Sequence, residues 1–302
     1  MNGELAYWPV VFGEVLFDEF PDGARVLGGA PFNMAWHLHH FGVRPLMITR
    51  VGNDDSGREI LARMREAGMD LRGVQLDDEH GTGLVRVVLT NGQPTFDIVA
   101  DRAYDHIAWE PLRPLLQSSG ERLLLCHGSL AARNAVSAEN LARLIELVRP
   151  YVFVDINLRP PWWDLAGVRR LLRTARWLKL NEEEVRLLEP SGGDLVDAAR
   201  TLLRPYHMAA VVVTRGEEGA LCCSSDGSVI QEPAPQVTRF VDAVGAGDAF
   251  SAVFVLGQLA DWPLETTLRR AVMFAAEICQ SQGATNAPPA LYETLRRGWD
   301  LV

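Results

Sequence analysis

A run of small residues before an aspartate, near the C-terminal end of the chain, is the strongest chemical signal in the sequence. Residues 241–250 read VDAVGAGDAF, and an apolar run follows. Small residues allow a tight turn whose N–H groups converge, and the positive end of a following helix would help to seat an anion there. Asp248 could then take a proton from a hydroxyl while the amides of Gly245–Gly247 hold the charge of a phosphoryl group. The alternative is an ordinary glycine-rich turn with an acid in the first helical turn.

Polar residues also follow four segments that are typical of short buried strands. In chain order they are Asp18; Asp155, Asn157 and Arg159; Asn181 and Glu184; and Thr214, Gly216 and Gly219. Ligands gather at the carboxyl ends of parallel strands, so we expect these groups and the GAGD turn to converge on one rim. Phosphoryl transfer requires groups that hold phosphates, oxygen ligands for Mg²⁺, a base and closure against water. One such cluster alone would indicate only a helix cap or turn, but four together favour this chemistry.

Residue type suggests individual roles on that rim. Asn181 and Glu184 offer the hard oxygen ligands that Mg²⁺ accepts, mainly through its water molecules. The alternative is that Asn181 caps the helix that follows it. Arg159 could neutralise phosphate charge as a planar fork, or form only a surface salt bridge. Asp18 and Asn33, next to a Gly-Gly pair that lets the backbone approach closely, could bind sugar hydroxyls.

The elements that must position these residues form an α/β pattern. Short apolar segments alternate with segments of helical spacing, which predicts a mostly parallel central sheet flanked by helices on both faces. The expected strands are 8–17, 46–51, 123–126, 151–155, 177–180 and 210–214, and the expected helices are 34–41, 56–67, 137–149, 168–174, 194–203, 265–282 and the one after Asp248. Ser56 and Glu59 match the capping-box pattern at the start of the second helix.

One stretch, residues 82–101, interrupts this alternation. Its apolar residues alternate as in strands, and Asn91-Gly92 predicts a tight hairpin turn. A hairpin among strand–helix repeats is more consistent with an excursion than with a core strand. We therefore expect a small β lid, formed by about residues 20–31 and 82–101, inserted in a single α/β domain of residues 1–302.

The amino-acid composition and net charge limit the classes of function that fit this chain. A hydrophobic fraction of 48%, with 23% charged residues over 302 residues, is ordinary for a globular enzyme, and the net charge of -10 argues against a nucleic-acid partner. No stretch is typical of a signal peptide or a membrane helix, and the four cysteines show no zinc spacing, as expected of a cytoplasmic protein.

The histidines show no ligand spacing beyond His37 and His40. The GAGDAF run also matches a dinucleotide fingerprint, but no strand with a ribose-binding acid follows it, which discounts a dehydrogenase.

Taken together, these motifs resemble those of the ribokinase-like (PfkB) carbohydrate kinases. The first family signature is similar to residues 28–35, GGAPFNMA, and the second to residues 242–250, DAVGAGDAF. Between them DINLR, KLNEEE and VVVTRGEEG occur in the family's order, so the resemblance covers nearly the whole chain. The opening GEVLFDEF, and PTFDIV followed by YDHI, look most similar to bacterial fructokinases.

The resemblance implies an ATP-dependent sugar kinase in which Asp248 is the base and the GAG amides form an anion hole. The residues expected in the site are Asp248, Gly245, Ala246, Gly247 and Arg159 for catalysis; Asp18, Gly28, Gly29, Asn33 and Phe96 for the sugar; Asn181, Thr214, Gly216, Gly219, Gly245 and Gly247 for ATP; Glu184 and Asn181 for Mg²⁺ through water; and Asp242 and Gly283 for K⁺. The family's usual Thr after its first Asp is replaced here by Ala243-Val244, so a potassium ion would depend on backbone ligands.

The expected reaction is the phosphorylation of the primary hydroxyl of fructose to give fructose 6-phosphate. Other substrates within the same family are ribose, 2-keto-3-deoxygluconate, a nucleoside or a sugar phosphate. A hypothesis of another class is a non-catalytic sugar or nucleotide sensor, although a pure binder gains little from a carboxylate beside phosphate. The lid predicts closure over the sugar, and its apolar face and strand edges predict a homodimer.

Overall fold

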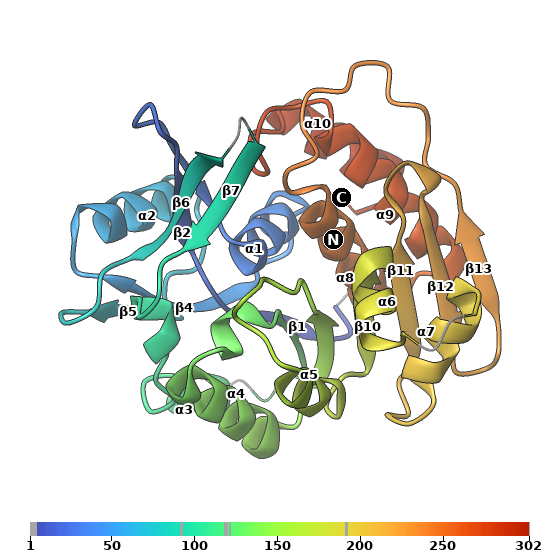
Figure 1. Cartoon of the computed structure of the whole chain (residues 1–302), viewed down its shortest axis with the longest axis horizontal. Coiled ribbons are helices and arrows are strands. Elements are labelled where there is room, and N and C mark those ends of the chain that lie inside the picture. The colour runs from blue at the N-terminus through green and yellow to red at the C-terminus, as the bar shows by residue number, and fades with distance from the viewer. Residues whose placement is uncertain (1–4, 91–92, 118–119, 121, 191–192, 302) are drawn as a thin grey trace.

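The computed structural model describes residues 5–90, 93–117, 120, 122–190 and 193–301. Its main element is a nine-stranded sheet of order β13-β12-β11-β10-β9-β8-β1-β4-β5 (Figure 1). The strands are β1 (Trp8–Phe12), β4 (Leu46–Gly52), β5 (Val74–Asp77), β8 (Leu123–His127), β9 (Tyr151–Asp155), β10 (Trp177–Asn181), β11 (Ala210–Thr214), β12 (Ala220–Ser224) and β13 (Val229–Glu232). All neighbours pair in parallel except β11–β12 and β12–β13. The predicted mostly parallel α/β sheet is confirmed.

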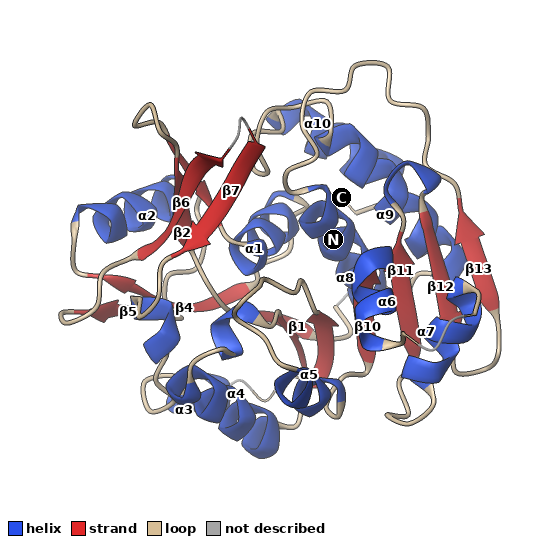
Figure 2. Cartoon of the chain, viewed as in Figure 1, coloured by secondary structure: helices blue, strands red, loops and turns tan. Residues whose placement is uncertain are grey.

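Helices cover both faces of this sheet (Figure 2). Successive residues of a strand point to opposite faces, so Val11 and Phe153 pack in one core while Val10 and Val154 pack in the other. The first core contains α1 (Ala30–His40), α2 (Asp55–Glu66), α8 (Ala246–Leu259), α9 (Leu264–Ile278) and α10 (Pro289–Gly298). The second contains α3 (Arg113–Gln117), α4 (Ala135–Val148), α5 (Leu165–Leu172), α6 (Glu182–Leu188) and α7 (Leu195–Leu203). Buried on both faces, the strands are almost wholly apolar, as parallel strands must be.

A second, smaller sheet has the order β3-β2-β6-β7, and we call it the lid sheet because β3, β6 and β7 fall in the stretches predicted to form a lid. Its strands are β2 (Leu16–Glu19), β3 (Arg25–Gly28), β6 (Gly83–Thr90) and β7 (Gln93–Ile98). Strands β6 and β7 are the antiparallel hairpin expected from the sequence; the turn predicted at Asn91-Gly92 lies outside the described residues. Strand β2 pairs with β6 in parallel, so the lid joins two distant parts of the chain.

Two local predictions are wrong. Residues 8–17 are not one strand: β1 ends at Phe12, and Asp18 lies in lid strand β2. The chain leaves the main sheet at Gly13, where φ is +155° and a Cβ would lie 2.3 Å from Cγ of Pro31. Helix α2 is capped by Asp54, whose Oδ1 accepts the Gly57 N–H at 2.7 Å, rather than by Ser56.

The strand order places a crevice between β1 and β8. From β1 the main sheet extends through β4 to β5 on one side, and from β8 through β9 to β13 on the other. Helices before and after such a switch point leave opposite faces of the sheet, so the carboxyl ends of the two strands border an opening where ligands bind. No helix in the described part of the chain is long and apolar enough to cross a membrane.

Candidate active site

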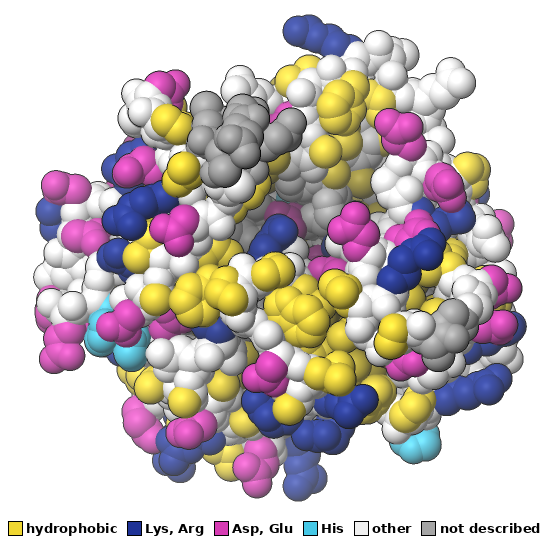
Figure 3. All heavy atoms as spheres, viewed as in Figure 1, with side chains coloured by type: hydrophobic (Ala, Val, Ile, Leu, Met, Phe, Trp, Pro, Cys, Tyr) yellow, Lys and Arg dark blue, Asp and Glu magenta, His cyan; other side chains and the backbone are white. Residues whose placement is uncertain are grey.

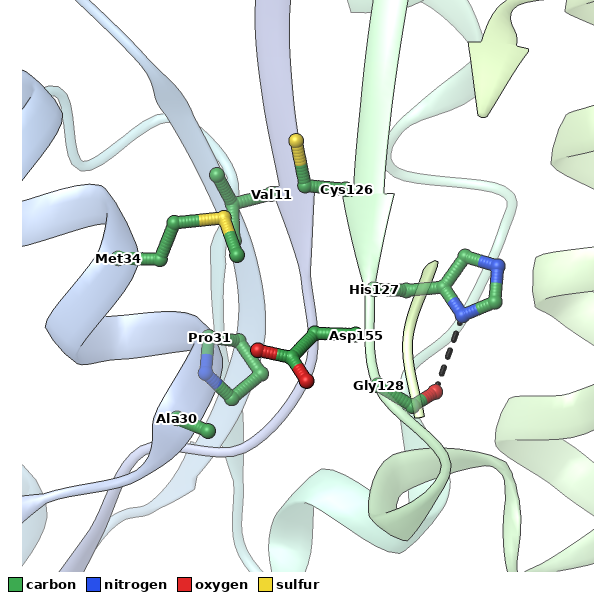
Figure 4. A pocket seen from close by; sticks show the side chains of 8 residues that line it. All are labelled: Val11, Ala30, Pro31, Met34, Cys126, His127, Gly128 and Asp155. Carbon is green, nitrogen blue, oxygen red and sulfur yellow. Dashed lines mark hydrogen bonds between the residues drawn. The ribbon is translucent and has the colours of Figure 1, made fainter. Parts of the chain in front are cut away.

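The carboxyl ends of β1, β8 and β9 enclose a small cavity beneath the N-terminus of α1. Eight residues line it: Val11, Ala30, Pro31, Met34, Cys126, His127, Gly128 and Asp155. The carboxylate of Asp155 points toward Pro31, while the ring of His127 points away and bonds through Nδ1 to the Gly128 carbonyl at 3.0 Å (Figure 4). The molecular surface is hollowed between the lid strands and the part of the chain that carries α6 and α10, with acidic and basic side chains inside the hollow (Figure 3).

The GAGD turn begins helix α8 beside this cavity. Gly245 caps the helix with φ of +81°, and a Cβ there would lie 2.2 Å from Cβ of Ala284, so both conformation and space require glycine. Asp248 occupies the third position of the helix, within the turn whose N–H groups have no acceptor inside the helix. The Ala246 N–H already donates to the Ala243 carbonyl at 3.2 Å, so this member of the predicted anion hole is engaged. The turn otherwise has the geometry of an anion seat.

Asp248 is held by the first signature helix. Its Oδ2 accepts a hydrogen bond of 2.7 Å from Nδ2 of Asn33 in α1. Burial raises the pKa of Asp248 to about 6; the Asn33 bond opposes this shift, Asp155 adds to it, and Lys179 and Arg159 oppose it. A carboxylate with this pKa is mostly ionised at neutral pH and more basic than an exposed aspartate, as a general base must be.

Two buried polar atoms near Asp248, Glu14 Oε2 and Asn33 Oδ1, have no hydrogen-bond partner among the described residues. The pKa of Glu14 is raised to about 7: burial is the largest cause, the charge of Asp248 adds to the rise, and Arg159 and Arg133 oppose it. Arg133 is itself held by two 2.8 Å bonds to Asp105. Because buried polar groups are normally paired, these atoms are suited to a ligand rich in hydroxyls.

The lid contributes one face to the same space. Asp18 pairs with Val85, Val85 with Ile98 and Val87 with Phe96, and directly opposed residues share a face. Val85 and Ile98 are buried, whereas Phe96 is 60% exposed. Burial raises the pKa of Asp18 to about 6, and Arg159 opposes that shift. Asp18 and Phe96 therefore lie on one face of the small sheet, and Arg159 lies close enough to Asp18 to affect its pKa.

Two glycines let the lid and α1 approach each other. Asp18 Oδ2 lies 3.5 Å from the position of a Gly28 Cβ. Gly29 caps α1 with φ of +110°, and a Cβ there would lie 2.6 Å from the Glu14 carbonyl oxygen. The Gly-Gly pair thus packs the backbone closely beside Asp18, which keeps the lid strand against the helix that carries Asn33.

The polar residues after β10 form a helix cap. The Asn181 side chain accepts the Glu184 N–H at 2.8 Å, and Glu184 Oε2 accepts the Asn181 N–H at 2.8 Å. Glu184 Oε1 also accepts the Leu158 N–H at 2.7 Å, which ties α6 to the segment that leads to Arg159. The capping alternative is confirmed. Burial raises the pKa of Glu184, and the Asn181 backbone bond and Lys179 oppose the rise.

The residues predicted for ATP at the end of β11, and those predicted for potassium, have the following contacts. Thr214 Oγ1 donates to the Leu180 carbonyl at 3.3 Å, and Gly216 is exposed with φ of +54°. At Gly219 a Cβ would lie 2.0 Å from the Glu232 carbonyl oxygen, so this glycine permits the approach of β13. Asp242 Oδ2 accepts the Gly283 N–H at 3.3 Å, which brings the two predicted potassium segments together.

Lys179, Glu14 and Arg133 were not among the residues expected in the site. Lys179 is buried and lies 3.1 Å from each carboxylate oxygen of Asp155. A signal for Lys179 exists, since it is a lysine inside the apolar strand sequence WLKLN. Glu14 follows an apolar strand directly, whereas nothing in the sequence around Arg133 indicates its pairing with Asp105.

One further cluster, which the sequence does not predict, lies at the base of the lid hairpin. His80 and His106 stack with 3.7 Å between ring centroids at 16°, and Asp101 Oδ1 lies 2.8 Å from Nε2 of His106. The three side chains offer metal-ligating atoms within 4.8 Å of one another. A metal must lie in the plane of each imidazole that binds it, and two nearly parallel stacked rings cannot both face one ion. We therefore interpret the cluster as a structural link, in which the stacked rings of His80 and His106 join the two ends of the hairpin.

Comparisons with known proteins agree with this geometry. The chain matches the family described as pfkB family carbohydrate kinase over residues 12–291. It is 32% identical over 272 residues to a fructokinase of Klebsiella pneumoniae, covering 86% of each protein. It is 30% identical over 301 residues to a fructokinase of Escherichia coli, covering 94% of this chain and 96% of that protein.

A solved structure extends the likeness to the fold. A fructokinase double mutant from Vibrio cholerae, in a form bound to fructose, ADP and potassium ion, is 25% identical with a TM-score of 0.82. The match covers 97% of this chain and 99% of that one. The expected ribokinase-like fold and the similarity to bacterial fructokinases are confirmed. The chain belongs to the PfkB family of carbohydrate kinases, phosphotransferases that act on sugars.

Proposed function

We propose that this kinase transfers the γ-phosphoryl group of ATP to the primary hydroxyl of fructose, giving fructose 6-phosphate. The observation that carries the proposal is the 2.7 Å bond that fixes the Asp248 carboxylate at the start of α8, beside the anion seat. Fructose itself is favoured by the relatives, since proteins named fructokinases are 30% and 32% identical to this chain. The partnerless hydroxyl-binding atoms around Asp248 suit a neutral polyol.

Asp248 would act as the general base. Its carboxylate accepts the proton of the primary hydroxyl as that oxygen bonds to the γ-phosphorus and the bond to the bridging oxygen of ADP breaks. The amides of Gly245–Gly247 and the Arg159 guanidinium would hold the charge on the transferring group, with the Ala246 amide released from its turn or unused. Asn33 orients the carboxylate, so that Oδ1 is left to face the hydroxyl.

The sugar would lie between the lid and the ends of β1 and β8. Asp18 and Asn33 would bind its hydroxyls, Gly28 and Gly29 would let the backbone approach it, and Phe96 would cover it from the lid. Phe96 is 60% exposed, which leaves a large apolar surface for a sugar face to contact. Closure of the lid would exclude water, which would otherwise compete as phosphoryl acceptor.

ATP would lie along the ends of β10 and β11, at Asn181, Thr214, Gly216 and Gly219. Each Glu184 oxygen already accepts a backbone N–H, and one lone-pair direction remains on each. Asn181 and Glu184 therefore fit a Mg²⁺ ion held through its water molecules rather than directly. When bound, Mg²⁺ neutralises phosphate charge.

A potassium site at Asp242 and Gly283 is also part of the proposal. The Asp242 carboxylate and the backbone oxygens near it are hard ligands for a cation. The two carboxylate oxygens of Asp242 accept hydrogen bonds from the N–H groups of Val244 and Gly283. The Vibrio cholerae relative contains a potassium ion. An ion here would steady the loop that leads into the GAGD turn.

We also propose a homodimer formed through the lid. Strands β3 and β7 lie at the two edges of the lid sheet, and Val88 is 47% exposed. Unpaired strand edges favour association with a second sheet. Sedimentation of the protein over a range of concentrations would give the mass, and a monomer at every concentration would contradict the dimer.

The test of the substrate is ADP release with Mg²⁺ and ATP across fructose, ribose, 2-keto-3-deoxygluconate, adenosine and fructose 6-phosphate. A clear preference for fructose is expected. Turnover of another member of this set would keep the mechanism and replace the substrate. No turnover with any of them, together with measurable sugar binding, would favour a non-catalytic sensor.

A further inference from the structure

A buried ion pair lies under the first turn of α8. Lys179 Nζ is 3.1 Å from both carboxylate oxygens of Asp155, and the two side chains are 8% and 5% exposed. Ser251 Oγ donates to Asp155 Oδ2 at 2.7 Å. Ser251 is three residues after Asp248 on the same face of the helix, so this bond fastens the turn that carries Asp248 to the ion pair.

The ammonium group also meets the backbone of the GAGD turn. A Cβ at Gly247 would lie 3.1 Å from Lys179 Nζ, which is closer than most contacts of real Cβ atoms. Glycine at this position therefore allows the turn to rest on the ammonium group. The pair is thus enclosed by β9, β10 and α8, directly beneath the proposed base and anion hole.

Stability alone does not explain such a pair. Removing two charges from water costs several kcal/mol per ion by rough estimates, and apolar replacements of buried pairs are often neutral or stabilising. We propose that the Asp155–Lys179 pair is a positioning device: it holds the GAGD turn in place and puts one negative and one positive charge next to the turn that carries the proposed base. This inference rests on the proposed kinase function.

The charges around Asp248 support the assignment. The charged groups that face it or its partners are Glu14 after β1, Asp155 on β9, Arg159 after β9, Lys179 on β10 and Glu184 on α6, and the neutral amide of Asn33 on α1 donates a hydrogen bond to it. Within this set, Asp155 raises the pKa of Asp248 and Lys179 lowers it. Because the two effects have opposite sign, loss of one partner leaves the effect of the other on the pKa of Asp248 unopposed.

The experiment is the pH dependence of kcat/KM for the sugar in the whole protein, with ADP release as the readout. Asp155→Asn keeps the shape and an acceptor for Ser251 but removes the negative charge. The acidic limb of the kcat/KM profile of Asp155→Asn should move to lower pH by about one unit, which is the size of pKa shift that one nearby charge produces. Its plateau kcat should also fall, because a less basic carboxylate is a poorer proton acceptor.

A double variant is the matched control for Asp155→Asn. Asp155→Asn with Lys179→Met removes both charges, whose effects have opposite sign, so its acidic limb should move back from that of Asp155→Asn toward that of the wild type. A limb that stays fixed in Asp155→Asn while activity falls would show a role in folding alone and overturn the inference. If Asp155→Asn does not fold, the double variant decides the question, because it leaves neither member of the pair buried without its partner. An acidic limb of its kcat/KM profile that lies a full pH unit from that of the wild type would overturn the inference. Absence of sugar-dependent ADP release in the wild type would instead contradict the proposed function.

Discussion

Asn33 donates a hydrogen bond of 2.7 Å from Nδ2 to Oδ2 of Asp248, across 215 residues of sequence. The bond joins the first and second family signatures and connects α1 to α8, two helices that pack on the same face of the sheet. It fixes one carboxylate oxygen, which leaves the other free to meet a hydroxyl. The packing of α1 on α8, together with this bond, therefore brings the two signatures side by side.

Loss of this bond should make Asp248 more basic but poorly placed. In Asn33→Ala the donor that lowers the pKa of Asp248 is removed, so the acidic limb of kcat/KM should rise above pH 6. We expect kcat/KM to fall by roughly ten- to a hundredfold, typical of a lost positioning contact. Asn140→Ala, which removes side-chain bonds to Ile107 and Val136 far from the site, is the control. An unchanged limb in Asn33→Ala would refute the role of the bond.

The anion seat should not tolerate a side chain at Gly245. Gly245→Ala must adopt φ of +81° and place a Cβ 2.2 Å from that of Ala284, so α8 has to move. We expect a loss of about 1–3 kcal/mol in unfolding free energy and a larger loss of kcat. Gly298→Ala, at a helix position with open space, should be neutral or slightly stabilising. Thermal melts and ADP release measure both, and equal behaviour of the two variants would contradict this account of the turn.

Asn181 is proposed both to cap α6 and to bind the nucleotide. Asn181→Ala should therefore lose about 1 kcal/mol of stability and also raise the KM for Mg-ATP. Asp194→Ala removes the equivalent cap from α7 and serves as the control. It should lose similar stability with no change in that KM. If the KM rises in neither variant or in both, Asn181 has only the structural role.

The ionised carboxylate of Glu14 should lower the free energy of unfolding at neutral pH. Its folded pKa of about 7 lies above the ordinary value of 4.5, so ionisation between these pH values disfavours the folded state. Glu14→Gln should match the wild type in melting temperature near pH 4.5 and exceed it increasingly up to about pH 7. The gain would be at most about 3 kcal/mol, since each pKa unit is worth about 1.4 kcal/mol. Glu139→Gln removes an exposed carboxylate as a control, and a Glu14→Gln gain that does not grow with pH would contradict the shift.

The sequence predicted the parts of the fold that local periodicity determines. Strands β9 and β11 have the predicted bounds, because each is an apolar run bordered by polar residues. The break between β1 and β2 was missed, since residues 8–17 are almost uniformly apolar and only the approach of Pro31 to Gly13 separates two strands. Likewise Ser56 matched the capping pattern, but Asp54 caps α2 and Ser56 instead accepts a bond from Arg25.

The candidate site was predicted where motifs mark it and missed where tertiary packing creates it. Asp248 and Asn33 lie in the two signatures and Arg159 follows β9, so their convergence could be expected, whereas Asp18 lies within β2 rather than after a strand. Lys179 and Asp155 share a strand register that no local pattern shows, with Asp155 directly opposite Lys179. Which of the GAG amides is free also depends on the turn geometry, which the sequence does not determine.

The central claim is that Asp248 is the base, and Asp248→Asn tests it most directly. Asp197→Asn is a matched control, because Asp197 is also the third residue of a helix, α7, and is exposed. With Mg²⁺, ATP and fructose, ADP release by Asp248→Asn should fall by a factor of about 10² or more, typical of a lost general base, while Asp197→Asn keeps wild-type turnover. Turnover by a folded Asp248→Asn protein near the wild-type rate would contradict the account.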